Sequence, residues 1–410
     1  DVYFSEIIEK ITKNQKLTNR EYSYILSLST IFYDEYQRKE KKGYLEFSYF
    51  LILNYSIMTN DYNPLLMFSI NNGLYPIAKS IFCKRQMNVQ DILFNKEIDF
   101  YKKNNIYELK KQYETRKALI ESTAQNRAYI APTSYGKSTA IIDDIYNHQL
   151  PKIGIIVPKK ALIWQTFRNI KKIAKCLKYK VLMHDTDYLN EDNVICIFTQ
   201  ERAIRLIQDN DFSFDTLYID EAHNLFEKDD RNILLARLIK LNKKLNPNQR
   251  VVYLSPLVKD ANDLVFSNNE FVEMQKIDFN IKEPTVKLFN RNKQVEVYNR
   301  FVDKYYLINE TYSSYKEYIQ KNLGGKNLFY FNKPKDIEMF AQKILSDIKE
   351  GEILLSELSN NDEIFEFSAM VSKYVDKDYF LVELIKYGIV FIHGKMPDLI
   401  KDYVLSLIHI

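Results

Sequence analysis

A short apolar run, Ala128-Tyr129-Ile130, leads directly into the loop sequence Ala131-Pro132-Thr133-Ser134-Tyr135-Gly136-Lys137-Ser138-Thr139. If a strand ends at Ile130 and a helix begins near Lys137, backbone N–H groups of the loop and of the helix N-terminus point at an anion. Lys137 would reach the β- and γ-phosphates of a nucleotide, and the Ser138 hydroxyl would hold Mg²⁺. Gly136 stands where a side chain would obstruct the phosphate. Because the first position is Ala131 and not glycine, the loop by itself suggests a phosphate site without establishing it.

Two adjacent carboxylates stand at the end of a later apolar run. There, Leu217-Tyr218-Ile219 is followed by Asp220-Glu221-Ala222-His223. Asp220 would hold Mg²⁺ directly or through water, and Glu221 would orient and deprotonate the attacking water. The alternative is an acidic turn that caps the next helix. Because both motifs stand at predicted strand ends and in this order, a metal-dependent nucleotide site is the better interpretation.

Apolar runs separated by helix-like spacers indicate the fold class of the middle of the chain. Runs of this length predict a buried parallel sheet in an α/β fold. They are residues 128–130, 153–157, 194–197, 216–219 and 251–254. A second, shorter series follows Gly324-Gly325, at residues 328–331 and 389–392. The sequence therefore predicts one complete parallel sheet and the beginning of another.

The remaining segments complete the predicted domain organisation. Aromatic and aliphatic side chains recur at helical spacing from residue 1 to about 107, as in Ile7, Ile8 and Ile11, which predicts an all-α N-terminal domain. We expect the α/β domain at residues 108–278. Residues 279–410 would then hold an inter-domain linker, near the start of the polar stretch 279–323 that carries Pro284, and an incomplete second domain.

The composition excludes several classes of protein. A chain of 410 residues is too long for one core, and its charged fraction of 27% is ordinary for a globular protein. No apolar stretch approaches the length of about 20 residues that spans a bilayer. The three cysteines form no CxxC pair, which argues against a zinc site or a disulfide framework and is compatible with a cytoplasmic location. Beyond Mg²⁺ we predict no metal.

The loop and the carboxylates resemble a known family. The loop is similar to motif I of superfamily 2 helicases, in its Ala-Pro-Thr-Ser-aromatic-Gly-Lys-Ser form, and Asp220 to His223 resemble motif II, the DEAH box. Val157 to Gln165 resemble motif Ia, and Thr199 to Arg202 resemble the threonine-containing motif between Ia and II. Ser255-Pro256-Leu257 stands in the place of motif III, which is usually Ser-Ala-Thr. Gly388 to Gly394 resemble a His-Gly segment early in the second domain of the family.

The resemblance implies a fold, cofactors and a set of site residues. It implies a complete RecA-like domain followed by part of a second one, an ATP hydrolase that uses Mg²⁺, and a nucleic-acid partner. Implied catalytic residues are Lys137, Asp220, Glu221 and His223, with Ser138 and Asp220 holding the metal. The nucleotide would contact Gln112, Pro132, Thr133, Ser134, Tyr135, Gly136, Lys137, Ser138 and Thr139. Arg116 is about as well placed as Gln112 to correspond to the family's adenine-reading glutamine.

Nucleic-acid contacts are predicted near motif Ia. Residues 151–182 carry nine basic side chains and no acidic one, and such a stretch can follow a phosphate backbone. The alternative is a solvated lysine-rich helix. The resemblance favours contact and implies Pro158, Lys159, Lys160, Thr199 and Arg202 as the binding residues. Trp164, the single tryptophan, is expected to lie in the core and not to stack on bases.

The two ends of the sequence suggest a piece of a longer protein. The chain begins at Asp1 without a methionine, and its last residues, Leu405 to Ile410, fit no pattern of the family. The arginine motif that the family supplies from its second domain has not appeared by then. The helical front and motif I resemble bacterial helicases of anti-phage defence systems, such as the Hachiman type, which would add a defence-system partner protein. The alternative function is a nucleotide-dependent binding module that closes on a partner without translocating.

Overall fold

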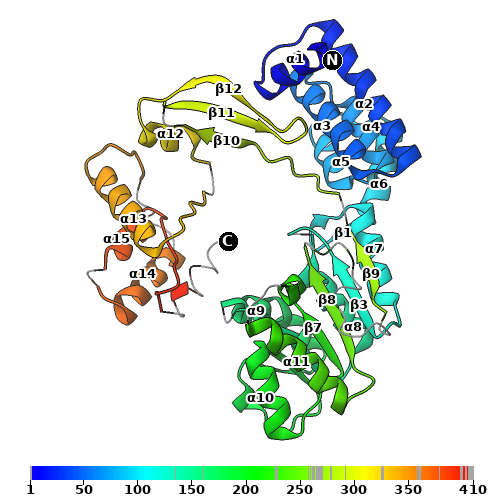
Figure 1. Cartoon of the computed structure of the whole chain (residues 1–410), viewed down its shortest axis with the longest axis vertical. Coiled ribbons are helices and arrows are strands. Elements are labelled where there is room, and N and C mark those ends of the chain that lie inside the picture. The colour runs from blue at the N-terminus through cyan, green and yellow to red at the C-terminus, as the bar shows by residue number, and fades with distance from the viewer. Residues whose placement is uncertain are drawn as a thin grey trace. The chain divides into compact units, whose positions relative to one another are not determined.

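The structure is a computed structural model, drawn in Figure 1. It describes residues 2–133, 135–159, 161–226, 230–256, 258, 260, 264, 271–277, 279–290, 292–324, 327–356, 358, 362–377, 379–397, 400–401 and 404. The chain divides into two compact units. Unit 1 is Asp1–Pro158 with Asn169–Glu310, and unit 2 is Lys159–Arg168 with Thr311–Ile410. None of the described helices is both long and apolar enough to cross a membrane.

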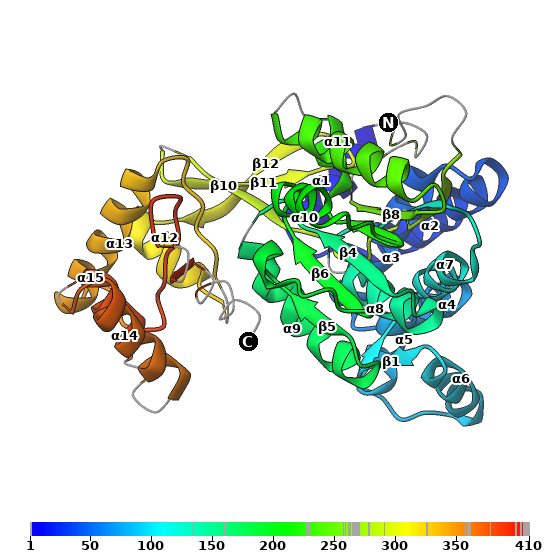
Figure 2. The same cartoon turned by 90° about the horizontal axis from the view of Figure 1, so that it is seen from below.

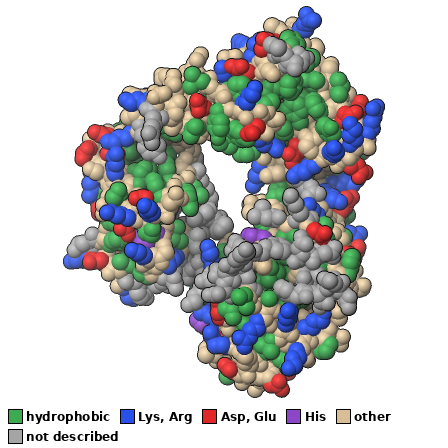
Figure 3. All heavy atoms as spheres, in the orientation of Figure 1, with side chains coloured by type: hydrophobic (Ala, Val, Ile, Leu, Met, Phe, Trp, Pro, Cys, Tyr) green, Lys and Arg blue, Asp and Glu red, His purple; other side chains and the backbone are tan. Residues whose placement is uncertain are grey.

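Unit 1 begins with a helical bundle, as predicted. Its helices are α1 (Val2–Thr12), α2 (Asn19–Lys39), α3 (Lys42–Thr59), α4 (Asn63–Asn71), α5 (Tyr75–Phe82) and α6 (Val89–Asp99). Thr18 caps the start of helix α2. Its hydroxyl accepts from the Glu21 N–H while the Glu21 carboxylate accepts from the Thr18 N–H, so two N–H groups that a helix start leaves free are bonded. Apolar side chains gather over this bundle in Figure 3.

The bundle packs around aromatic and aliphatic side chains that are far apart in sequence. Its core is formed by Ile7, Ile8, Ile11, Leu17, Ile25, Phe47 and Leu51. Phe301, from a turn late in unit 1, packs against this core with tilted rings, its centroid 4.9 Å from those of both Phe47 and Phe50. Most tyrosines and phenylalanines of this region therefore serve packing, in agreement with the sequence pattern.

A seven-stranded parallel sheet forms the centre of unit 1 and confirms the predicted RecA-like α/β fold. The strands are β3 (Asn126–Ile130), β4 (Lys152–Ile156), β5 (Lys180–Leu182), β6 (Val194–Phe198), β7 (Thr216–Ile219), β8 (Arg250–Ser255) and β9 (Glu273–Lys276). Their order across the sheet is β5-β6-β4-β7-β8-β3-β9. All pairings are parallel. The short strands β5 and β9 were not predicted, because neither has a long apolar run.

Helices cover both faces of the sheet, as a parallel sheet requires. They are α7 (Lys110–Glu121), α8 (Lys137–His148), α10 (Gln200–Asn210) and α11 (Asp230–Leu245). Helix α9 (Ala161–Cys176) follows β4, and its first half, up to Arg168, belongs to unit 2. Leu217 and Ile219 of β7 share a core with the apolar side chains of α10 and α11. Tyr218, between them on the same strand, points to the other face and donates to Asp144 of α8 at 2.6 Å. In Figure 2 α8 and α10 lie on opposite sides of the strands.

A fully buried ion pair joins the strand before the phosphate loop to the helix after it. Arg127 of β3 donates from both terminal nitrogens to the Asp144 carboxylate of α8, at 2.6 and 2.9 Å, and also to the Leu119 carbonyl. Both side chains are 1% exposed. Burial by itself would raise the pKa of Asp144, but hydrogen bonds from His148 and Arg127 outweigh it, and the pKa lies below its ordinary value. Asp144 is therefore ionised at neutral pH.

A small antiparallel sheet follows the parallel one. Its strands are β10 (Val286–Phe289), β11 (Gln294–Asn299) and β12 (Lys304–Thr311), with β11 in the middle. An earlier hairpin, β1 (Lys102–Lys103) with β2 (Ile106–Tyr107), connects α6 to α7. Residues 279–285, where we placed the start of the inter-domain linker, form neither helix nor strand. The sequence analysis identified strands by continuous apolar runs, so it missed β10–β12, in which polar and apolar residues alternate.

Unit 2 is built from helices. These are α12 (Tyr315–Asn322), α13 (Pro334–Lys349), α14 (Asp362–Tyr374) and α15 (Phe380–Lys386). Phe367, Val371, Leu381 and Leu384 form the centre of its core. In this part of unit 2, residues 325–326, 357, 359–361, 378, 398–399, 402–403 and 405–410 lie outside the described residues.

The two strands predicted in unit 2 are wrong. Residues 328–331 and 389–392 form no strand in the described part of the chain. Leu328 and Tyr330 are 89% and 84% exposed, so this apolar run is not buried. A parallel strand needs a neighbouring strand for its N–H and C=O groups, and no described segment of unit 2 supplies one. The division of residues 279–410 into a linker and the start of a second RecA-like domain stays a prediction.

We expect Arg127→Met to lower the free energy of unfolding by about 3–5 kcal/mol, because it leaves the Asp144 carboxylate buried without its main partner. Urea denaturation followed by circular dichroism measures the change. The matched control is Arg205→Met, which removes an ion pair between Arg205 and Asp185 at the surface and should cost about 1 kcal/mol or less. Equal losses in the two variants would contradict the proposed role of the buried pair.

Candidate active site

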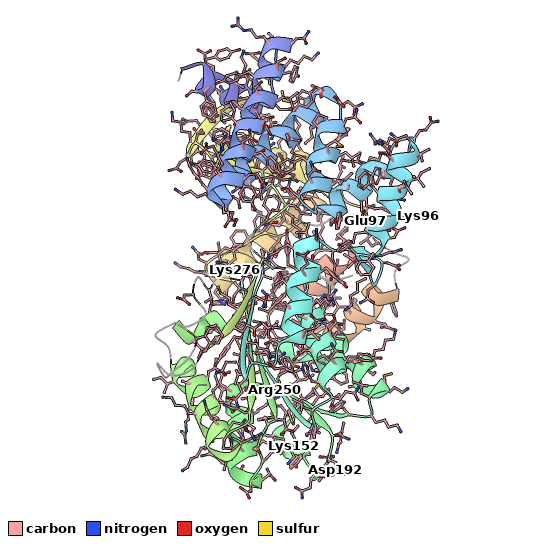
Figure 4. The ribbon with its side chains drawn as sticks, turned by 90° about the vertical axis from the view of Figure 1, so that its right-hand side faces the viewer. Lys96, Glu97, Lys152, Asp192, Arg250 and Lys276 are labelled. Carbon is pink, nitrogen blue, oxygen red and sulfur yellow. The ribbon has the colours of Figure 1, made fainter. Side chains whose placement is uncertain are left out.

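The order of the strands brings the predicted motifs to one edge of the sheet. Parallel strands end on the same side, and in open α/β sheets ligands bind outside their carboxyl ends. We call this side the carboxyl edge; it consists of the last residues of β3, β4, β6, β7 and β8 and the first residues that follow each of them. Figure 4 labels Arg250 and Lys152 at the opposite edge, where β8 and β4 begin, and Lys276, where β9 ends.

Along the carboxyl edge, nucleotide and nucleic-acid candidates occupy adjoining positions. Asp220 follows β7, Ser255 ends β8 and Ala131 follows β3, so these residues stand on three neighbouring strands. Pro158 follows β4 and Thr199 follows β6, on the other side of β7. Backbone hydrogen bonds fix the junctions, with the Ala131 N–H donating to the Ser255 carbonyl at 3.0 Å and the Asp220 N–H donating to the Ile156 carbonyl at 2.9 Å.

The phosphate loop connects β3 to α8, as the sequence predicts. Helix α8 begins at Lys137, and Gly136 caps it with a φ of +78°, a left-handed conformation that favours glycine. A β-carbon at Gly136 would lie 3.1 Å from the Gln112 side-chain nitrogen, closer than ordinary contact. The amide of Gln112 therefore lies against the loop. Ser134 lies outside the described residues.

Arg116, the alternative to Gln112, has a different role. It forms ion pairs with Glu108 and Asp143, and its side chain is 9% exposed. Its guanidinium is thus held by two carboxylates, one of them on α8. Gln112 lies one helical turn earlier on α7, beside Gly136. Of the two, the structure places Gln112 at the phosphate loop.

Lys137 supplies the strongest indication of an anion site. Its Nζ atom is buried and has no hydrogen-bond partner within the described parts of the chain. A buried ammonium without a partner is costly, and an incoming phosphate would provide one. The same charge acts on Asp220: burial raises the pKa of this carboxyl, the charge of Glu221 raises it further, and Lys137 opposes the increase. The two side chains are therefore close enough to interact electrostatically.

The other members of the loop differ in exposure. Ser138 and Thr133 are exposed, whereas Pro132 and Thr139 are half-buried. The exposed hydroxyl of Ser138 stands in the first turn of α8, next to Lys137, where a metal ligand of this loop is expected. Tyr135 is different, because its ring is only 5% exposed and its hydroxyl bonds residues outside the loop. Its side chain supports the loop, and its backbone is the part that can face a phosphate.

The residues after β7 form a small hydrogen-bonded group. The Glu221 N–H donates to the Asp220 carboxylate at 3.0 Å. Glu221 has a φ of +52°, which costs a residue other than glycine about 1–3 kcal/mol and is typical of functional sites. Its carboxylate lies 3.4 Å from the His223 ring nitrogen Nδ1. The same nitrogen lies 3.3 Å from the hydroxyl of Ser255, so His223 joins the end of β7 to the end of β8.

The nucleic-acid candidates are placed less uniformly. Lys159 is exposed and Pro158 half-buried, whereas Thr199 is buried. Arg202 donates to the Met183 carbonyl at 2.6 Å, so its guanidinium contributes to packing. Lys160 lies outside the described residues.

The prediction that Trp164 lies in the core is wrong, because it is 45% exposed. On α9 the buried positions are Ile163, Ile170 and Ala174, at spacings of seven and four residues. Trp164, one residue after Ile163, falls outside that stripe. The apolar character of Trp164 did not predict its burial, because only one side of α9 is buried.

Sequence reasoning missed three contributors to the site. The buried pair of Arg127 with Asp144 carried no sequence signal, since both are polar residues in predicted regular elements. The bond between His223 and Ser255 could have been anticipated, because motifs II and III end neighbouring strands. The partner of the Tyr135 hydroxyl, Asn280, could not, because it lies 145 residues away in an irregular segment.

Comparisons with known proteins agree with this geometry. The family model for DEAD/DEAH box helicases matches residues 110–264, the segment that carries the loop, the carboxylates and Ser255. Anti-bacteriophage protein B of Escherichia coli (strain K12) is 28% identical over 137 residues, which cover 30% of this chain and 18% of that protein. The chain thus spans less than a fifth of this curated relative.

Solved structures of helicases are also similar. The helicase Lhr of Mycobacterium smegmatis, bound to ssDNA and AMP-PNP, is 20% identical with a TM-score of 0.33, over 41% of this chain and 25% of that chain. A hypothetical ATP-dependent RNA helicase from Sulfolobus tokodaii is 20% identical with a TM-score of 0.32, over 40% of this chain and 51% of that chain. Motifs I and II, at the ends of β3 and β7, thus lie within residues 110–264, the segment that the DEAD/DEAH box helicase model matches.

Proposed function

We propose that the protein is a DEAH-box ATP hydrolase whose intact form couples the hydrolysis of Mg-ATP to movement along nucleic acid or to separation of its strands. The observation that carries the proposal is the buried Lys137 ammonium without a hydrogen-bond partner among the described residues. It stands at the start of α8, where backbone N–H groups favour an anion, and it acts electrostatically on Asp220.

The proposed chemistry divides among the site residues. Lys137 and the N–H groups at the start of α8 would bind the phosphates, while Ser138 and Asp220 hold Mg²⁺. The metal, when bound, neutralises charge that develops on the phosphate oxygens. Glu221 would orient the attacking water and accept its proton. His223, between the Glu221 carboxylate and the Ser255 hydroxyl, would orient the base and connect hydrolysis to the motif III position.

The nucleic-acid part of the proposal rests on position and charge. Lys159 is exposed and follows Pro158 at the carboxyl edge, beside the strand that leads to Asp220. The basic residues of the following helix include Arg168, Lys172 and Lys175, which are exposed. A phosphate backbone attracts such a stretch without regard to sequence, so DNA and RNA are equally compatible with it.

The proposed setting of the protein follows from a sequence similarity and from its cysteines. The similarity to anti-bacteriophage protein B supports a role in phage defence, with a partner protein of the defence system. The three cysteines are free, which supports a cytoplasmic location.

We expect Lys137→Ala to abolish nucleotide binding while leaving the fold stable. The substitution removes the charge that meets the phosphates, yet breaks no described hydrogen bond. Titration with a fluorescent ATP analogue measures binding, and thermal unfolding tests the fold. Lys244→Ala, an exposed lysine near the end of α11, is the matched control and should bind normally. Wild-type affinity in Lys137→Ala would rule out the assignment of the loop.

The two carboxylates should respond differently to loss of charge. Glu221→Gln should retain Mg-nucleotide binding but slow hydrolysis, by about 10²–10⁴-fold, because the amide can bond water yet cannot accept its proton. Asp220→Asn should weaken Mg²⁺-dependent nucleotide binding itself. Magnesium titrations of binding and steady-state ATP turnover in the intact protein separate the two effects. An equal loss of affinity in both variants contradicts this division of roles.

Nucleic acid should stimulate ATP turnover in the intact protein, and Lys159→Gln should reduce that stimulation. If Lys159 contacts one phosphate of a single strand, the slope of log affinity against log salt should fall by about 0.7. Fluorescence anisotropy at several salt concentrations measures the slope, with Lys244→Gln as the control. ATP turnover that ignores nucleic acid would instead favour the nucleotide-dependent binding module.

A further inference from the structure

The hydroxyl of Tyr135 connects the phosphate loop to the segment that follows the parallel sheet. We call residues 279–281 the connector. The Tyr135 hydroxyl donates to the Asn280 side-chain oxygen at 3.0 Å, and the Ile281 N–H donates to the Tyr135 hydroxyl at 3.0 Å. Tyr135 is the residue before Gly136, so any movement of the connector acts directly on the loop.

The connector is bonded on its other side to the helical bundle. The hydroxyl of Tyr49, on α3, donates to the Ile281 carbonyl at 3.0 Å. The Tyr49 ring also packs edge-on against Phe279, with centroids 5.6 Å apart. Both backbone polar groups of Ile281 are therefore bonded to tyrosine hydroxyls, one from the phosphate loop and one from the bundle.

Both tyrosines are well suited to hold fixed hydrogen bonds. Tyr49 is 2% exposed and Tyr135 is 5% exposed, so water competes little for their hydroxyls. Burial raises the pKa of both phenols, which keeps them neutral over the physiological range. The Tyr135 carbonyl additionally accepts from the Tyr129 hydroxyl at 3.3 Å, which ties the loop to β3.

The chain beyond the connector is attached to the same bundle. Asn299, the last residue of β11, donates to the Thr12 hydroxyl at 2.8 Å. Arg300 pairs with Glu46 of α3 and with Glu283, both at 2.7 Å. Together with Phe301 in the bundle core, these contacts hold both ends of the β10–β11 segment on the helices. The bundle is thus a fixed support for the connector.

We propose that Tyr135 is a positioning residue of the phosphate loop, and that the helical bundle sets the loop's affinity for nucleotide through Tyr49, the connector and Tyr135. This inference rests on the proposed nucleotide site. In this arrangement the N-terminal bundle holds the loop in the conformation that receives phosphate. By linkage, nucleotide at the loop must also stabilise the bonds of the connector to the bundle.

The test compares single hydroxyl deletions in the 410-residue chain. Tyr135→Phe and Tyr49→Phe should each weaken binding of a fluorescent ATP analogue by roughly 3- to 10-fold, the usual effect of one hydrogen bond. The double variant should lose less than the product of the two, because both act through Ile281. Tyr179→Phe is the matched control, since Tyr179 is also buried and its hydroxyl bonds the Leu150 carbonyl at 2.9 Å, away from the connector.

Asn280 provides a rescue that a merely structural role would not show. Asn280→Asp keeps the oxygen that accepts from Tyr135 and should bind nucleotide nearly as the wild type does. Asn280→Leu removes it and should weaken binding as Tyr135→Phe does. Hydrogen exchange should show that nucleotide protects the Ile281 amide in the wild type and in Tyr179→Phe, but not in Tyr135→Phe.

The outcomes distinguish this inference from the proposed function. If binding depends on Lys137 but is unchanged in Tyr49→Phe and Tyr135→Phe, the coupling is wrong and the nucleotide site stands. If Tyr179→Phe weakens binding as much as Tyr49→Phe, the effect is general destabilisation and the coupling is also wrong. A wild-type chain without Lys137-dependent binding overturns both.

Discussion

The buried ion pair between Arg127 and Asp144 fixes the geometry on which the candidate site depends. It joins β3 to α8 on either side of the phosphate loop, and Tyr218 of β7 donates to the same carboxylate. One carboxylate therefore aligns the strand that leads into motif I, the helix that follows it and the strand that leads into motif II. Because such a pair is costly to bury and more costly to break, it allows little freedom between these elements.

The rest of the carboxyl edge follows from parallel pairing. Strands β7, β8 and β3 are neighbours, so Asp220, Ser255 and the phosphate loop meet although long helices separate them in sequence. The loop itself is held from two directions, by Tyr129 within the sheet and by the connector through Tyr135. Lys137 follows this loop at the start of α8, and its ammonium has no hydrogen-bond partner among the described residues. A site prepared in this way has little reorganisation left when an anion binds.

Most of the fold of unit 1 could be predicted from the sequence, and the elements that were missed lack the pattern that identified the others. Strands β3, β4, β6, β7 and β8 are apolar runs buried on both faces, so composition alone identifies them. Strands β5 and β9 are short strands at the edges of the sheet, and each pairs with a single neighbour. Strands β10–β12 alternate polar and apolar residues, so they contain no continuous apolar run. In unit 2, the apolar runs at 328–331 and 389–392 predicted strands that are absent from the described residues, because strand formation needs a partner that a local pattern cannot supply. The prediction that Trp164 is buried was wrong for a related reason, since its exposure depends on which side of α9 is buried.

The sequence by itself predicted the chemistry that we propose for this protein, from a glycine, lysine and serine between a strand and a helix and from two carboxylates at the end of another strand. These residue types act through local geometry, because the loop and the helix start create the anion site wherever the chain places them. Only the tertiary structure decided which residues support that chemistry. Gln112 and not Arg116 lies at Gly136, because two carboxylates hold the guanidinium. Tyr135 faces the connector and not the phosphate, because its partners come from Asn280 and Ile281, and contacts across such sequence distances leave no periodic signal in the chain.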